Sequence, residues 1–398
     1  MAVKNRKFVL YTLALINFTH IVDSMLIMPL GDIFIELFQI NARQYSYLVS
    51  SYAIAAFFSS LAGVFFLDRF DRKKALLFIY TGFAAGTFLC AFAESYPMLL
   101  SLRFLTGIFG GMIGALVLSI VSDLYLFKER GQAMGILFSA FSAASALGIP
   151  IGIFLAAKGS WQWPFFTIGI LGFLIATFIY FIFPSMSAHF SEVDKHFSFK
   201  NTIKAITRDF NQMKALSAAF ILVLAHFLII PFISPYMIKN VGMSQMEISY
   251  QFFLGGAATI ISAPFVGRLT DKLGVMKVFS VMMIISFVPT YMITNMEYIS
   301  IYIALTWTTL FFIFASGRMI SPNALITAAA PISNRGSFMS IKSALQQLAI
   351  FASSLISGMI VFIENNQYLY YEYVGYLSIG FGLLAIYVVS KLQVAKGN

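Results

Sequence analysis

The feature that most constrains the fold is a block of six charged residues in seven positions, Asp68–Lys74, which lies between two long apolar runs. Such a block cannot sit in hydrocarbon, so we predict a short, tight loop between two membrane helices. Four of the six charges are cationic, which places the loop on the cytoplasmic side. A related stretch, Gly267–Lys277, follows later, and Asp68 and Asp271 are 203 positions apart. One loop repeated at about half the chain length predicts a duplicated bundle of membrane helices.

The composition agrees with this prediction, since 60% of the 398 residues are hydrophobic and only 11% are charged. With roughly 20 residues needed for each span, the chain can hold about a dozen. We predict twelve spans, at about Phe8–Leu30, Ser46–Leu67, Ala75–Ala93, Met98–Val121, Ala133–Ala157, Pro164–Phe183, Ala215–Ile238, Ile248–Val266, Val278–Thr294, Ile299–Ile320, Phe338–Phe362 and Val374–Val389. The expected fold class is an all-α polytopic membrane protein with twelve transmembrane helices in two six-helix pseudo-repeats.

The expected domains are an N-terminal six-helix bundle over residues 1–184, a cytoplasmic linker over 185–214 and a C-terminal bundle over 215–398. The linker is the longest polar segment. Within it, Phe199, Ile203 and Ile206 have helical spacing, which predicts an amphipathic helix on the membrane surface. Residues 324–330 leave open whether the tenth span extends beyond Ile320.

The distribution of Lys and Arg tests this topology. Of 26 such residues, 21 fall in segments assigned to the cytoplasm and three in segments assigned outside, while Arg103 and Arg318 lie inside helices. This bias predicts an even number of spans with both termini cytoplasmic. It also accounts for the net charge of +10 without nucleic acid as a partner. The lone Cys90 excludes a disulfide within the chain and argues against a structural zinc site.

The charged loops carry a resemblance to a known family. Asp68, Arg69 and Arg72 fit the loop signature of the major facilitator superfamily, in which glycine and acidic positions precede a cluster of cations. The second copy fits better, with Gly267, Asp271, Lys272 and Gly274 at matching positions. Asp71 and Val64 depart from the first copy's glycines. The resemblance implies a latch that favours an outward-open state. The alternative is that these cations only anchor the loops on the cytoplasmic side.

Two further stretches resemble motifs of that superfamily. Arg103, Gly107 and Gly111 look like the motif of proton-coupled members, and Gly148, Pro150 and Gly152 look like that of twelve-span drug and sugar efflux members. The glycines share one helix face in each case, so they allow close helix packing, and the proline predicts a bend. Plain packing explains the same residues without a gating role.

Two charged residues and one histidine fall within the first half's spans. His20 and Asp23 lie three positions apart in the first span and hence share a face, which predicts a proton or substrate site. The alternatives are that Asp23 lies nearer the outer surface or is bonded statically to His20. Arg103 must face protein or a water-filled cavity, because a cation in a span costs roughly 2.5–3.5 kcal/mol. Its alternative role is structural, through backbone carbonyls.

The second half offers weaker candidates for proton coupling or substrate binding. His226 lies 203 positions after Asp23, although a lone histidine in an apolar helix is more often structural. Arg318 either lines a cavity or lies at the membrane interface. Gln346 either binds substrate or bonds to another helix.

We therefore expect an inner-membrane secondary transporter with alternating access, with proton-coupled efflux of a small drug-like or sugar-like compound as its task. The alternatives are an importer of a small metabolite, a siderophore exporter, or a non-transporting sensor with the same fold. No P-loop and no catalytic constellation is present in the sequence, so we expect no enzyme activity, no metal and no cofactor, with a proton gradient as the energy source. The expected partners are a small-molecule substrate and the lipid bilayer, and the expected state is a monomer.

Overall fold

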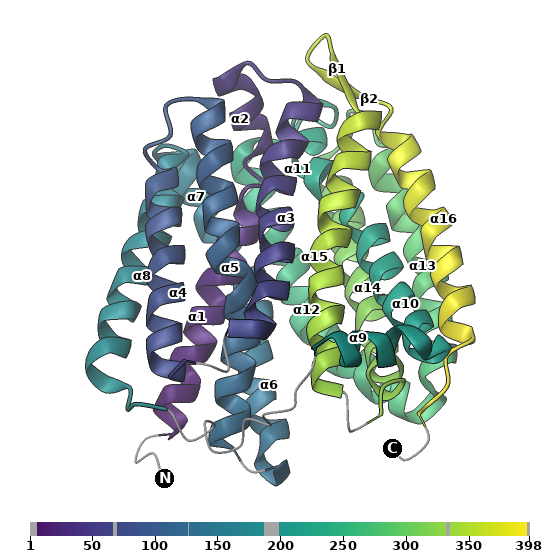
Figure 1. Cartoon of the computed structure of the whole chain (residues 1–398). Coiled ribbons are helices and arrows are strands. Elements are labelled where there is room, and N and C mark those ends of the chain that lie inside the picture. Colours follow the sequence, from purple (N-terminus) through teal and green to yellow (C-terminus); the bar gives the residue numbers. More distant parts are fainter. Residues whose placement is uncertain (1–5, 67–69, 126, 187–198, 332–334, 396–398) are drawn as a thin grey trace. The chain divides into compact units, whose positions relative to one another are not determined.

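A computed structural model describes residues 6–66, 70–125, 127–186, 199–331 and 335–395, which are almost entirely helical (Figure 1). The first group of elements is α1 (Arg6–Leu26), α2 (Gly31–Phe38), α3 (Ala42–Phe66), α4 (Arg72–Cys90), α5 (Tyr96–Leu124), α6 (Phe127–Ala143), η2 (Ala144–Gly148), α7 (Ile149–Lys158) and α8 (Gln162–Ile182). The second group is α9 (Phe199–Arg208), α10 (Phe210–Phe227), α11 (Ile230–Lys239), α12 (Gln245–Leu273), α13 (Val275–Thr294), α14 (Ile301–Ala328), α15 (Arg335–Ile360), β1 (Phe362–Glu364), β2 (Gln367–Leu369) and α16 (Tyr371–Ser390).

These helices confirm the all-α polytopic fold class. Within the described residues, eleven helical stretches are long and apolar enough to cross a membrane. The remaining predicted span, Ala75–Ala93, coincides with most of the 19-residue α4. The first turn of α4 carries Arg72, Lys73 and Lys74, and these three cations lower its hydropathy. The tenth span continues as helix to Ala328, so the open alternative for residues 324–330 is resolved in favour of extension.

The helices form two compact units. Unit 1 comprises Met1–Ile27 and Ser51–Phe197, and unit 2 comprises Met28–Ser50 and Ser198–Asn398. Residues 28–50 therefore pack with the C-terminal helices, although the sequence assigns them to the N-terminal bundle. In unit 1, α4 packs along α5 and α8, and α1 packs against α5, α6, η2 and α8. In unit 2, α14 packs along α12 and α13, and α10 packs along α15 and α16.

Each unit buries its own apolar core. The core of unit 1 includes Leu76, Phe83 and Ile120, and that of unit 2 includes Leu222, Phe279 and Phe338. Long apolar side chains also cover the outward faces of the helices, as a bilayer solvent allows.

Two of the predicted spans are interrupted helices, and a proline follows each interruption. The fifth span contains a π-helical turn, η2, immediately before Pro150, and the seventh breaks between α10 and α11, just before Pro231. A proline has no N–H to donate to the carbonyl four residues earlier, so the regular α-helical ladder fails at these points.

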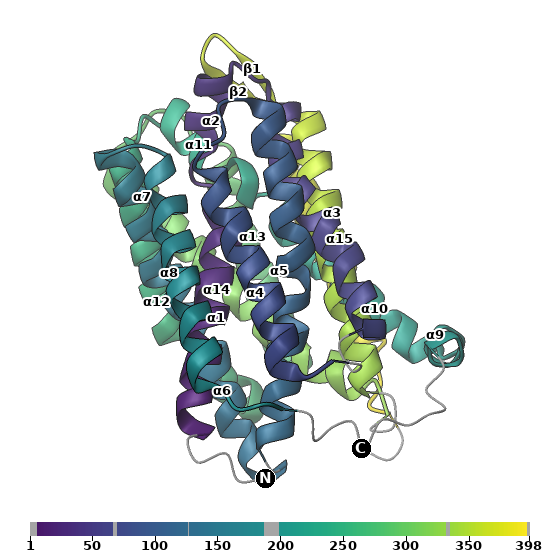
Figure 2. The ribbon, with the colours of Figure 1, turned by 60° about the vertical axis from the view of Figure 1, so that its left-hand side comes forward.

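The predicted amphipathic helix is present as α9, which lies transverse to the long helices of unit 2 (Figure 2). Its Ile206 is buried in the core of unit 2, so part of its apolar side faces protein. Asp209 caps the following helix, α10, by accepting from the N–H groups of Asn211 and Gln212.

Each copy of the charged stretch contains a helix cap. Asp71 caps α4 by accepting from the Lys74 N–H, and its Oδ2 accepts from Ser185 and from the Met186 N–H, each at 2.7 Å. The prediction of a loop is wrong for most of the second copy: Gly267–Leu273 is still helix, and only Gly274 separates α12 from α13. Gly274 has φ +86°, a conformation that side-chain-bearing residues rarely adopt.

A two-stranded hairpin, β1–β2, follows α15 and was not predicted, since the sequence pattern extended the eleventh span to Phe362. Phe362 pairs with Leu369 and Glu364 with Gln367. The two turn residues, Asn365 and Asn366, both have positive φ, as the tightest hairpin turns require.

Residues 28–50 dock on α11 and the hairpin within unit 2. Lys239 at the end of α11 forms ion pairs with Asp32, at 3.5 Å, and with Glu36. The Tyr368 hydroxyl donates to Asp32, and the Tyr45 hydroxyl reaches the carbonyls of Met28 and Pro231.

Candidate functional site

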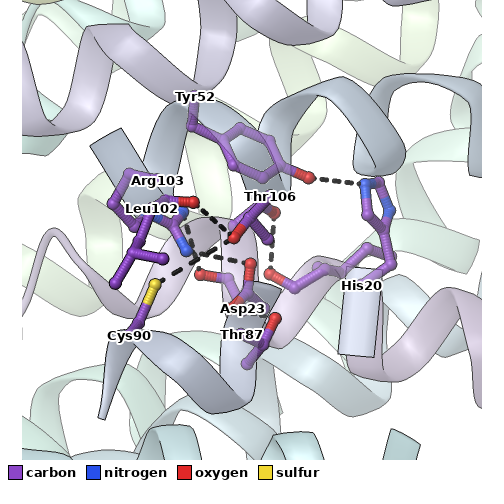
Figure 3. A network of polar contacts seen from close by, with 10 residues as sticks. His20, Asp23, Tyr52, Thr87, Cys90, Leu102, Arg103 and Thr106 are labelled. Atoms are coloured by element: carbon purple, nitrogen blue, oxygen red, sulfur yellow. Dashed lines mark hydrogen bonds and ion pairs between the residues drawn. The ribbon is translucent and has the colours of Figure 1, made fainter. Parts of the chain in front are cut away.

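Three helices of unit 1 bring a buried ion pair together (Figure 3). Asp23 lies in the last turn of α1, Thr87 in the last turn of α4 and Arg103 about two turns into α5. Each of the three residues is 0% exposed. A carboxylate and a guanidinium buried so completely offset part of each other's desolvation cost when they pair.

The carboxylate of Asp23 has a partner on each oxygen. Arg103 Nη1 donates to Oδ2 at 3.0 Å, and Thr87 Oγ1 donates to Oδ1 at 3.0 Å. Arg103 Nη2 also points to the backbone carbonyl of Asp23, at 3.5 Å. Both carboxylate oxygens of Asp23 therefore accept a hydrogen bond in this arrangement, one of them from a cation.

Tyr52 on α3 covers the other side of Arg103. The Arg103 guanidinium carbon lies 4.7 Å from the Tyr52 ring centroid, within cation–π range. Glycines allow this approach: a Cβ at Gly110 would lie 2.1 Å from Tyr52 Oη, and one at Gly107 would lie 2.4 Å from the Tyr52 carbonyl oxygen. A Cβ at Gly111 would meet Ala56 and Ser59 of the same helix. Gly107 and Gly111, predicted to permit close packing, thus set the distance between α3 and α5.

His20 lies in α1 near the ion pair but forms its hydrogen bond with Tyr52. Its Nε2 is 2.9 Å from Tyr52 Oη, and its ring meets the edge of Phe83 at 5.7 Å. The structure therefore has no bond between His20 and Asp23, because Nε2 contacts Tyr52 and Nδ1 has no hydrogen-bond partner. Tyr52 links the two residues: its hydroxyl contacts His20 and its ring contacts Arg103.

Gly148 and Gly152 pack against the same helix that carries Asp23. A Cβ at Gly148 would lie 2.2 Å from Val22, and one at Gly152 would lie 2.6 Å from Leu26. Pro150 is in the first turn of α7, directly after η2. The irregular turn and the small residues thus lie against the segment of α1 that presents Asp23.

In unit 2, Arg318 of α14 is 1% exposed and donates from Nη1 to Ser286 Oγ at 3.0 Å. His226 of α10 stacks on Phe311, with ring centroids 6.0 Å apart. The Arg318 side chain is buried in protein, and its role stays a prediction. Gln346 lies half-buried on α15, apart from the contacts described for these residues.

Five of the latch residues lie within the part of the chain that the structure describes. Asp68 and Arg69 lie outside the described residues. Arg72 bonds Asp123 of α5 at 3.1 Å. Asp271 and Lys272 are exposed in the last turn of α12, and a Cβ at Gly267 would meet open space. A latch role for these residues stays a prediction.

Sequence reasoning missed Tyr52, Thr87 and Thr106. Thr106 contacts Cys90 Sγ at 4.0 Å and donates to the Leu102 carbonyl. Hydroxyl residues are common in apolar helices, so their types gave no signal. Only the spacing of Thr106 from Arg103, about one turn along α5, could have drawn attention to it.

Comparisons with known proteins agree with this architecture. The family model described as Major Facilitator Superfamily matches residues 13–212 and 215–395. The uncharacterized MFS-type transporter YceJ of Bacillus subtilis (strain 168) is 23% identical over 64% of this chain and 65% of its own length. Multidrug resistance protein 2 of the same organism is 24% identical over 94% of this chain and 93% of its own. This chain thus spans just under two thirds of the first relative and nearly all of the second.

A solved structure shares the fold. The crystal structure of a D-xylose-proton symporter superposes with a TM-score of 0.74, covering 98% of both chains at 16% identity. At this identity the likeness concerns the fold alone.

Proposed function

Because this chain belongs to the Major Facilitator Superfamily, and is therefore a multi-pass membrane transporter and not an enzyme, we propose that it moves a small organic compound by alternating access, driven by protons that bind Asp23. The observation that supports this most is the buried pair of Asp23 and Arg103, with Thr87 on the second carboxylate oxygen. We further propose efflux across a bacterial inner membrane with both termini cytoplasmic, and no cofactor beyond the proton gradient.

The pair has the chemistry of a proton exchange. A proton on Asp23 would cancel its charge, and Arg103 would lose the ionic part of its bond. Arg103 would then retain the face of Tyr52, at 4.7 Å, as a neutral partner. Conversely, separating Arg103 from Asp23 would leave a bare carboxylate in apolar surroundings, which favours uptake of a proton. Movement of α5 against α1 would thus load and release the proton.

His20 is the proposed route by which the proton reaches the pair. The residue as a whole is half-buried although its Nδ1 is buried, whereas Asp23 is fully buried, and Tyr52 contacts both His20 and Arg103. Protonation of His20 would disturb its bond with Tyr52 and, through the ring of Tyr52, the support of Arg103.

One relative supports efflux as the direction of transport. The relative named a multidrug resistance protein aligns with nearly the whole chain. Uptake stays the second candidate, since an ion-coupled carboxylate can serve either direction of transport.

The test is proton flux in proteoliposomes that contain a pH-sensitive dye. Ethidium, D-xylose and succinate are added in turn to wild type, Asp23→Asn and Glu364→Gln, with an imposed pH gradient of either sign. Glu364 is an exposed carboxylate in the hairpin and serves as the matched control. We expect at least one probe to drive proton flux in wild type and Glu364→Gln. In Asp23→Asn that flux should fall at least tenfold, while exchange of the probe partly persists.

Proton flux in Asp23→Asn equal to that of wild type would show that the proton is carried elsewhere. The gradient sign that supports accumulation distinguishes efflux from uptake. No flux with any probe under either gradient would favour the sensor alternative.

A further inference from the structure

Arg318 is a buried cation without a carboxylate partner in the described part of unit 2. Its Nη1 donates to Ser286 Oγ at 3.0 Å and approaches Met283 Sδ at 4.0 Å, and its Nη2 is buried with no hydrogen-bond partner. The Ser286 hydroxyl gives its own proton to the Met283 carbonyl, at 2.6 Å, so it offers Arg318 a neutral oxygen only.

The sequence explains why no counter-ion is near. Every Asp and Glu of unit 2 lies in α2, at a helix end, in the hairpin or in a connection: Asp32, Glu36, Asp209, Glu247, Asp271, Glu297, Glu364 and Glu372. Arg318 lies ten residues before the end of α14, hence about 15 Å along the helix axis. The described helices of unit 2 therefore bring no acid to its depth.

A buried ring nitrogen of unit 2 is also unpartnered. His226 Nδ1 is buried without a hydrogen-bond partner. Its ring stacks on Phe311, at an interplanar angle of 11°. Phe311 and Arg318 are two turns apart on α14 and so share a face of that helix.

The contrast with unit 1 is informative. There the buried arginine, Arg103, has a carboxylate at 3.0 Å. An arginine cannot shed its proton to relieve burial, so a guanidinium with neutral contacts alone is costly to keep. A purely structural role would be filled at less cost by an apolar side chain of similar length.

We propose that Arg318 and His226 form a subsite for a carboxylate group of the transported compound. This inference rests on the proposed function, which identifies that compound as the substrate. The planar guanidinium matches a carboxylate through paired N–H donors, and Nη2 is the free one. His226 supplies a second donor when its Nδ1 carries the proton. The subsite would select a substrate that carries a carboxylate, and Asp23 would remain free to carry the proton.

The test is carboxylate-induced stabilisation of the purified protein, measured as the thermal unfolding midpoint in detergent at one fixed pH. The probes are benzoate, lactate and succinate, each beside its neutral amide. We expect at least one carboxylate to raise the midpoint of wild type by at least 2 °C more than its amide does. Arg318→Met should lose this difference, and Arg318→Lys, which lacks the planar fork, should keep only part of it.

Two variants serve as controls. Lys342→Met removes another buried cation of unit 2, one that already donates to Asn323 Oδ1 at 2.6 Å, and should keep the carboxylate effect. Asp23→Asn should also keep it. Because no proton gradient is present, this result is independent of proton coupling, and either claim can fail alone.

Without probe, Arg318→Met should unfold at a midpoint equal to or above that of wild type, since it removes an uncompensated charge. A lower midpoint would show that the Ser286 bond holds α13 and α14 together, which would overturn the proposal. Stabilisation that survives Arg318→Met, or no carboxylate that exceeds its amide in wild type, would overturn it equally.

Discussion

Gly111 is the position at which a single methyl group should most directly separate two helices of unit 1. A Cβ there would lie 2.4 Å from the Ala56 carbonyl oxygen and 2.6 Å from Ala56 Cα. Ordinary contacts of this kind are about 3.5 Å, so α5 and α3 would have to separate by about 1 Å. The obstacle is backbone, which cannot rotate away as a side chain can.

The magnitude follows from three contributions. Overpacking of this kind costs about 1–3 kcal/mol. The separation would also stretch the bond from Ser60 Oγ to the Gly111 carbonyl, now 2.8 Å, at a cost of about 0.5–1.5 kcal/mol. The better helix propensity of alanine returns about 1 kcal/mol. We expect Gly111→Ala to be destabilised by about 0.5–3.5 kcal/mol.

Gly114 on the same helix provides the matched control. A Cβ there would meet nothing within 4 Å, so Gly114→Ala should gain up to about 1 kcal/mol from helix propensity alone. The measurement is thermal unfolding of both variants and wild type in one detergent. If Gly111→Ala were as stable as Gly114→Ala, the close approach of α3 and α5 would not limit stability, and the reasoning would be refuted.

Two further predictions concern carboxylates outside the spans. Partial burial disfavours the charge on Asp71, but its bonds with Ser185 and with the N–H groups of Lys74 and Met186 lower its pKa overall. Asp71→Ala should therefore cost about 0.5–2 kcal/mol at pH 5–8, and this cost should shrink as the pH falls below about 3.9 and through the lowered pKa. A cost that is undiminished in acid unfolding curves would contradict this prediction. Burial raises the pKa of Asp32, although the neighbouring charge of Lys239 opposes this rise. Lys239→Met should therefore raise the pKa of Asp32 further and lower the unfolding midpoint, and this loss should grow as the pH rises through the raised pKa. A loss of unfolding midpoint that is the same at pH 5 and pH 8 would show that the ion pair does not set this pKa.

The spans were predictable because hydropathy and the distribution of cations are properties of short windows. Asp23 and Arg103 could each be singled out for the same reason, since a charge in an apolar helix is conspicuous. Their pairing was not predictable, because it depends on how far α1 and α5 slide along each other. For the same reason the sequence pattern grouped His20 with Asp23, whereas the structure turns His20 toward Tyr52.

The irregular elements show a different limit. Pro150 predicted a bend but not a π-helical turn before it, since both a kink and an extra residue relieve the missing N–H. The hairpin after Ile360 had a local signal in Asn365 and Asn366, but the apolar run before it outweighed two turn residues. The assignment of residues 28–50 to unit 2 depends on contacts with Lys239 and Pro231, which lie some 200 positions away along the chain.

The single residue between α12 and α13 has a mechanical consequence. Gly274 ends one 29-residue helix and begins a 20-residue helix, and both pack along α14. A longer loop would be a flexible connection and would let the two helices shift independently, but a single residue allows almost no independent movement. Any tilt of α12 during the transport cycle should therefore be accompanied by movement of α13. Because both helices pack along α14, the helix that carries Arg318 should feel this movement as well.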